Sequence, residues 1–65
     1  MKKSIKRQIA ERLVEGIRQG KIIVDRDGTV TRDGRTLKRN LSKYIMLRMV
    51  REGAKLNEAG YYEAS

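Results

Sequence analysis

The sequence predicts an α+β fold with an N-terminal helix, a central β-hairpin that a third strand can extend into a meander, and a second helix. Three observations predict this order. Apolar residues recur at helical spacing up to Gly20, consecutive β-branched residues and two Asp-Gly pairs follow, and a second stretch of helical spacing ends at Gly53. No linker interrupts the 65 residues, so we expect one basic mini-domain over residues 1–65.

The first helix is expected over residues 4–20. Ser4 is a suitable N-cap, and Gly20 suits the left-handed conformation that often follows the end of a helix. The apolar stripe has a main spacing of four residues and consists of Ile5, Ile9, Ala10, Leu13, Val14 and Ile17. This stripe should face the core.

The hairpin is expected directly after the helix. The consecutive β-branched residues 22–24 suit a short buried strand. Asp27-Gly28 and Asp33-Gly34 favour tight turns, because both residue types tolerate positive φ. We therefore predict strands at 22–26 and 29–32, with a third strand at 35–37.

The second helix is expected over residues 41–52. Asn40 or Ser42 can cap its start, and Gly53 can end it. A strand is the alternative, because apolar residues also alternate there, but Met, Leu and Arg favour a helix. After Gly53, either Tyr61 and Tyr62 dock on the core or the tail 54–65 frays. The expected core is Ile9, Leu13, Ile17, Ile23, Val30, Leu41, Ile45 and Leu47.

The composition excludes several kinds of chemistry. Without His or Cys there is no thiol nucleophile, no zinc finger and no Ser-His-Asp triad. We expect no enzyme, no catalytic residue, no metal site, no cofactor and no small-molecule substrate. No apolar run approaches the roughly 20 residues of a membrane span, so we expect a cytoplasmic protein without a membrane partner.

The stretch KIIVDRDGTV, residues 21–30, resembles the first motif of haloacid dehalogenase-type phosphohydrolases, in which an apolar strand leads into DxDGT. The resemblance implies a nucleophile at Asp25 and a general acid/base at Asp27, since two such carboxylates can face one phosphate and a Mg²⁺ ion. That family also needs a helix-packed parallel sheet, a later Ser or Thr, a Lys and a further acidic pair. A chain of 65 residues cannot supply this scaffold, so we interpret the match as an Asp-Gly turn.

A longer stretch, VDRDGTVTRDGRTLKRNLSKYIMLRM, resembles the small DNA-binding modules appended to phage-type HNH endonucleases. The matching parts are a hairpin with an internal Gly, a Gly-Arg…Leu-Lys run and a Tyr-led apolar segment. Here they fall on Gly28, Val30, Gly34-Arg35, Leu37-Lys38 and residues 44–47. The resemblance implies DNA binding. The order of helix, strand and hairpin is also similar to winged-helix proteins, which place a hairpin on the DNA backbone.

The positive charge is clustered. The net charge of +8 is made up of +4 in residues 1–7, zero in 8–31, +6 in 32–51 and −2 in 52–65. Clustered like charges repel one another unless an anion compensates them, and nucleic acid is the commonest such partner. We predict a DNA-binding regulator of transcription or accessory factor of phage or plasmid type. Duplex DNA is favoured over RNA, because no aromatic platform interleaves the basic residues.

The expected contacts to nucleic acid are basic residues at the N-terminus, beside the two turns and around the start of the second helix. They are Lys2, Lys3, Arg26, Arg32, Arg35, Lys38, Arg39 and Lys43. The alternative is a protein-interaction module that binds an acidic surface of a larger machine through the same charges. A homodimer is also expected, because Gly16 leaves room for close helix contact and two-fold DNA sites favour dimeric readers.

Overall fold

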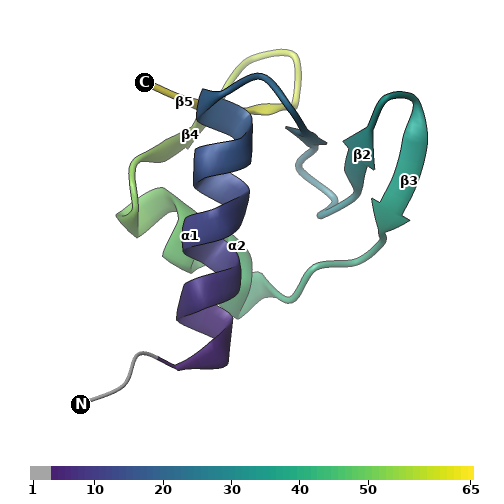
Figure 1. The fold of residues 1–65 in the computed structure, drawn as a ribbon. Coiled ribbons are helices and arrows are strands. Elements are labelled where there is room, and N and C mark those ends of the chain that lie inside the picture. The colour runs from purple at the N-terminus through teal and green to yellow at the C-terminus, as the bar shows by residue number, and fades with distance from the viewer. Residues whose placement is uncertain (1–3) are drawn as a thin grey trace.

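The computed structural model describes residues 4–65, and the predicted contact residues Lys2 and Lys3 lie outside this range. The predicted α+β fold is confirmed, with a helix, a three-strand meander and a second helix in the expected order. In residues 4–65, no helix is long and apolar enough to cross a membrane. The elements are α1 (Ile5–Arg18), β1 (Ile23–Val24), β2 (Val30–Arg32), β3 (Arg35–Lys38), α2 (Lys43–Arg51), β4 (Ala54–Leu56) and β5 (Tyr62–Ala64) (Figure 1).

Both helices are bounded by residues that the sequence identified. The hydroxyls of Ser4 and Ser42 each accept a hydrogen bond at 3.1 Å from the backbone N–H three residues further on. Gly20 and Gly53 follow the C-caps with φ values of +72° and +110°, which glycine adopts at little cost. The alternative of a strand in the second segment is wrong.

The first sheet is an antiparallel meander in the order β1-β2-β3. Asp33 and Gly34 form its second turn with φ values of +52° and +77°, so both central residues have the positive φ of a type I′ hairpin turn. Arg32 pairs directly with Arg35 across this turn. The third strand that the sequence left open is therefore present, and it extends to Lys38.

The chain after Gly53 forms a second hairpin from β4 and β5. The sequence analysis expected either docked tyrosines or a frayed tail in this segment, and it did not predict these two strands. Asn57 organises the turn, because its Oδ1 accepts from the Tyr61 N–H at 3.0 Å and its Nδ2 donates to Glu63 Oε1 at 3.0 Å. An isolated bridge between Asp25 and Tyr61 joins this hairpin to the meander.

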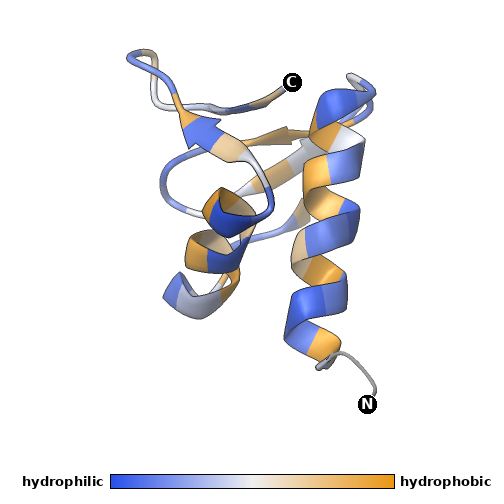
Figure 2. Cartoon of the chain, turned by 90° about the vertical axis from the view of Figure 1, so that its left-hand side faces the viewer, coloured by the Kyte–Doolittle hydropathy of each residue, from blue (hydrophilic) through white to orange (hydrophobic). Residues whose placement is uncertain are grey.

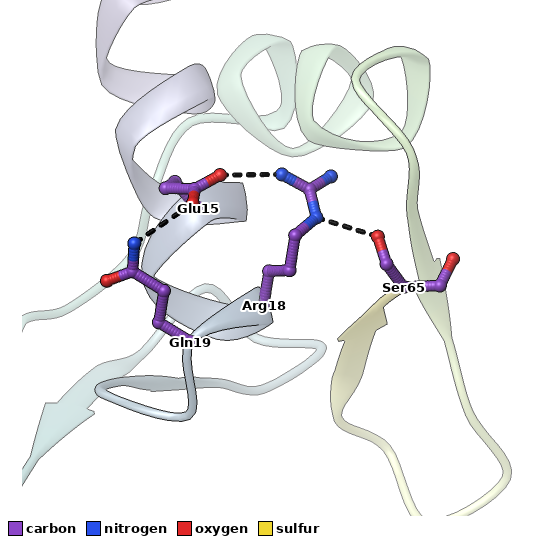
Figure 3. A network of polar contacts seen from close by, with 4 residues as sticks. All are labelled: Glu15, Arg18, Gln19 and Ser65. Carbon is purple, nitrogen blue, oxygen red and sulfur yellow. Dashed lines mark hydrogen bonds and ion pairs between the residues drawn. The ribbon is translucent and has the colours of Figure 1, made fainter.

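The C-terminal end of α1 holds the end of the second hairpin. Arg18 Nε donates to the backbone oxygen of Ser65 at 2.7 Å, and Arg18 Nη1 lies 2.6 Å from Glu15 Oε2 (Figure 3). Gln19 donates to the other oxygen of Glu15 at 3.0 Å, so this carboxylate is shared by two side chains. These contacts fix β5 against α1.

The core lies between α1, α2, the first two strands and the second hairpin. Leu13 and Ile17, which we expected in the core, are half-buried and pack against its edge. Of the other expected core residues, three are confirmed as buried. The full set of buried apolar residues is Ala10, Val14, Val24, Val30, Leu41, Ile45, Met49 and Ala54.

The prediction that Ile9, Ile23 and Leu47 belong to the core is wrong. These residues are 37%, 55% and 66% exposed. In α1, the smaller Ala10 and Val14 are the fully buried residues instead. Successive strand residues point to opposite faces, so the burial of Val24 turns Ile23 outward. In α2, the buried residues are four positions apart, which leaves Leu47 on the far side.

Gly16 makes a close contact inside the chain. A Cβ at this position would lie 2.9 Å from Cγ1 of Ile22, so the glycine admits the Ile22 side chain against α1. Ile22 thus covers part of Gly16 from within the chain, which leaves less room for close helix contact with a second copy. The homodimer itself stays a prediction.

Candidate nucleic-acid interface

The β2–β3 hairpin stands out to one side of the helices (Figure 1). We call residues 30–40 the basic ribbon. Every residue from 32 to 40 is exposed, and this stretch holds Arg32, Arg35, Lys38 and Arg39 against the single acid Asp33. The structure therefore brings four of the predicted contact residues together on one projecting element.

Most of this charge is not compensated within the chain. Arg32 Nε lies 3.9 Å from Asp33 Oδ2, and both side chains are more than half exposed, so this ion pair is weak. In the part of the chain that the structure describes, no ion pair involves Arg35, Lys38 or Arg39. An anion approaching the ribbon would meet little competition from protein carboxylates.

The register of the ribbon determines which basic side chains lie together. Arg32 and Arg35 are direct cross-strand partners, so they share one face of the ribbon. Leu37 is an extra residue in β3, and such a β-bulge bends the strand before Lys38. Arginines therefore flank the tip, and Lys38 and Arg39 lie at the base.

The base of the ribbon is closed by Gly28 and Leu41. The Leu41 N–H donates to the Gly28 carbonyl at 3.1 Å. A Cβ at Gly28 would lie 2.7 Å from this nitrogen, and the residue has a φ of +83°, so the position requires glycine. This contact holds the start of α2 at the ribbon base, and Lys43, the first residue of α2, is exposed there.

Arg26 lies apart from the ribbon tip. Its backbone N–H donates to the Gly60 carbonyl at 2.9 Å, which ties the β1–β2 loop to the second hairpin. Its side chain lines a hollow of about 310 Å³ together with the acids Asp25, Asp27 and Glu58. Three acidic residues therefore line the same hollow as Arg26, whereas the ribbon has Asp33 as its single acid.

Asp25 holds the loop in which it lies. Its Oδ1 accepts from the backbone N–H groups of Asp27 at 2.9 Å and Thr29 at 3.0 Å, as in an Asx turn. One oxygen of the carboxylate that the phosphohydrolase motif would use as nucleophile is thus bonded to the backbone. Within residues 4–65, no group of three or more His, Cys, Asp or Glu side chains could hold a metal ion.

Sequence reasoning missed one exposed surface on α2. Tyr44, Leu47 and Val50 are 52%, 66% and 51% exposed and recur every three residues, and we call these three the α2 ridge. Figure 2 shows hydrophobic residues both between the two helices and on the side of α2 turned away from α1. The three-residue spacing of these side chains is visible in the sequence, but the same spacing is also expected of a helix face that is buried in the core.

Comparison with known proteins gave no match to a family model, to a curated protein or to a solved structure. What this chain binds is therefore inferred from its own residues.

Proposed function

We propose that the protein binds nucleic acid, with duplex DNA favoured over RNA, and acts as a regulator of transcription or accessory factor of phage or plasmid type. One observation carries the proposal: the basic ribbon projects four basic side chains, three of them without an ion pair in the described residues. Cytoplasmic location is part of the same proposal, because phage and plasmid DNA are found in the cytoplasm.

The shape of the ribbon suits the major groove of DNA. A two-stranded ribbon fits a groove about 12 Å wide, in which each base pair presents its own pattern of donors and acceptors. The tip pair Arg32 and Arg35 is placed to reach base edges, where arginine recognises guanine with two hydrogen bonds. Lys38, Arg39 and Lys43 at the base would contact phosphates and set the orientation.

Two features favour duplex DNA over RNA. The exposed tyrosines Tyr44 and Tyr61 lie outside the ribbon, so unstacked RNA bases would find no aromatic platform among its basic residues. The major groove of duplex RNA is too narrow and deep for side chains to read. Among RNAs, a duplex whose major groove is already widened would compete best with duplex DNA.

The test is a salt titration of binding to random duplex DNA, using a triple variant and a matched control. Arg35→Ala, Lys38→Ala and Arg39→Ala together should flatten the log–log salt slope by about 2–3, since each phosphate contact contributes about 0.9. Lys21→Ala, Arg51→Ala and Lys55→Ala remove the same charge from exposed residues outside the ribbon. The control should change the slope much less.

Two results would contradict the proposal. If the control triple weakens binding as much as the ribbon triple, overall charge rather than the ribbon attracts the DNA. If the wild-type protein binds no duplex DNA at about 50 mM salt, where phosphate contacts are strong, nucleic acid is not the partner. The alternative of an acidic protein surface would then replace it.

A further inference from the structure

We infer that α2 carries a second docking surface, which binds a segment of a partner protein with apolar side chains flanked by carboxylates. This inference goes beyond nucleic-acid binding and rests on α2, whose Lys43 is the one residue shared with the phosphate contacts proposed above. It starts from the α2 ridge, which the core leaves uncovered.

The ridge is the outer side of a helix whose inner side is fully used. Ile45 and Met49 are buried against the core, whereas more than half of each ridge side chain is exposed. Single exposed apolar residues are ordinary on protein surfaces, but contiguous ones mark interaction sites. The ridge residues are three apart, so neighbouring members lie side by side on one helix surface.

Two shallow hollows flank Leu47 and make the patch continuous. One, of about 240 Å³, lies between Met46, Leu47, Val50 and Tyr62, with Lys43 at its rim. The other, of about 110 Å³, is lined by Tyr44, Leu47, Arg48 and Arg51. Leu47 therefore stands between an almost wholly apolar hollow and one that two arginines help to line.

The charges around the ridge are all of one sign within α2. The helix contains Lys43, Arg48 and Arg51 and no acid. Glu52 compensates Arg48, with 3.3 Å between Nη2 and Oε2, but no ion pair in the described residues involves Lys43 or Arg51. Lys6 adds a further cation, because its Nζ lies 5.5 Å from the centre of the Tyr44 ring.

This combination selects one class of occupant. A second copy docked ridge to ridge would bring like charges together, which is unfavourable in an interface. DNA offers phosphates to the cations but little to cover three apolar side chains. An acidic amphipathic helix satisfies both, because its apolar residues can enter the hollow beside Tyr62 while its carboxylates meet Lys43 and Arg51.

The probe is a fluorescein-labelled helical peptide with leucines at positions i, i+3, i+4 and i+7 and glutamates beside them. Two control peptides separate the contributions: one replaces each leucine by serine, and the other replaces each glutamate by glutamine. Fluorescence anisotropy should show binding of the first peptide and at least tenfold weaker binding of both controls. Amide shifts in an NMR titration should concentrate in residues 43–51.

Leu47→Ser should weaken binding of the acidic peptide about tenfold or more, as expected for a side chain at the centre of an interface. The matched control is Leu37→Ser, which changes a 58%-exposed leucine on the basic ribbon and should leave peptide affinity within about twofold. Circular dichroism should show both variants folded, because each replaces an exposed residue.

Each of the following results would overturn the inference. They are equal binding of the serine peptide, equal weakening by Leu37→Ser, no binding of the acidic peptide at millimolar concentration, and self-association of the wild type that Leu47→Ser abolishes. Loss of duplex DNA binding in Leu47→Ser would also overturn it, because α2 would then lie on the nucleic acid. Nucleic-acid binding by the ribbon is measured separately, so either proposal can fail alone.

Discussion

The basic ribbon and helix α2 both carry uncompensated positive charge, but they differ in what lies between the charges. In the ribbon the intervening side chains are mostly polar, with Thr31, Thr36 and Asn40 among them and Leu37 as the one exposed apolar residue. In α2 they are the exposed ridge residues. Positive charge alone indicates an anionic partner, and the groups between the charges indicate which class of partner fits.

The two regions also differ in how they are supported. Helix α2 buries Ile45 and Met49 in the core, whereas Val30 is the one fully buried residue of the ribbon. Beyond its base, the ribbon depends on hairpin pairing and on its turn. Segments with few buried apolar contacts open at lower free energy, so the ribbon should loosen before α2 does.

The largest expected effect is unfolding of the whole domain, which abolishes binding at both the basic ribbon and α2. Met49 is completely buried, so Met49→Ala should lower the free energy of unfolding by about 2–5 kcal/mol. That is a large part of the stability of any small domain, and both DNA and peptide binding should be lost. Thermal unfolding followed by circular dichroism measures the effect, with the half-buried Met46→Ala as a milder control. An unchanged melting temperature in Met49→Ala would contradict the placement of this side chain in the core.

The next largest effect is a difference in how strongly salt weakens binding at the two regions. Four phosphate contacts through Arg35, Lys38, Arg39 and Lys43 would lower DNA affinity roughly 100-fold between about 50 and 200 mM salt. Binding of the acidic peptide to α2 should fall only a few-fold, because apolar contact is not screened by salt. Parallel titrations of one protein preparation make the comparison. Equal salt dependence would mean that charge alone acts at both surfaces.

A smaller effect concerns the ribbon tip. Gly34→Ala forces a left-handed conformation on alanine and should destabilise the turn by about 1 kcal/mol. DNA affinity should fall several-fold while peptide binding stays unchanged. Gly20→Ala is the matched control, since Gly20 also has positive φ and a Cβ there would meet nothing within 4 Å, but it lies after α1. A similar loss of DNA affinity in both variants would show that the turn has no special role.

The smallest expected effect is that of Asp25→Asn. The amide oxygen of asparagine can still accept the two backbone N–H groups that hold the loop, so stability should change by less than about 0.5 kcal/mol. DNA affinity should be equal or slightly higher, because a negative charge is removed. Assays of a generic phosphomonoester with Mg²⁺ test the motif directly. Turnover that Asp25→Asn abolishes would restore the phosphohydrolase interpretation.

Local signals in the sequence were sufficient for most of the fold. Ser4, Ser42, Gly20 and Gly53 mark helix ends through interactions within a few residues, and the Asp33-Gly34 turn brings Arg32 opposite Arg35. The gathering of basic side chains on one projecting hairpin follows from that turn. These features depend on neighbours in the chain, so a single sequence contains them.

Features that depend on distant residues were missed. The stripe of α1 has several apolar residues, and the identity of its buried side depends on α2, which packs against Ala10 and Val14. The second hairpin needs Asn57 in its turn and a bridge from Tyr61 to Asp25, and its strands are too short to show alternation. Exposure of Leu47 likewise depends on what the rest of the chain leaves uncovered.

The hydrogen bond from the Leu41 N–H to the Gly28 carbonyl separates the ribbon from the rest of the fold, so the ribbon can be exchanged as a unit. The chain leaves the core after Val30 and returns to it at Leu41, and the bond from Leu41 to Gly28 closes the base of the exposed stretch between them. Changes of length or sequence beyond Val30 would alter what the exposed stretch touches without repacking the helices. Under the two proposals above, replacing this one stretch of chain would give the protein a new nucleic-acid target and leave the proposed docking surface on α2 unchanged.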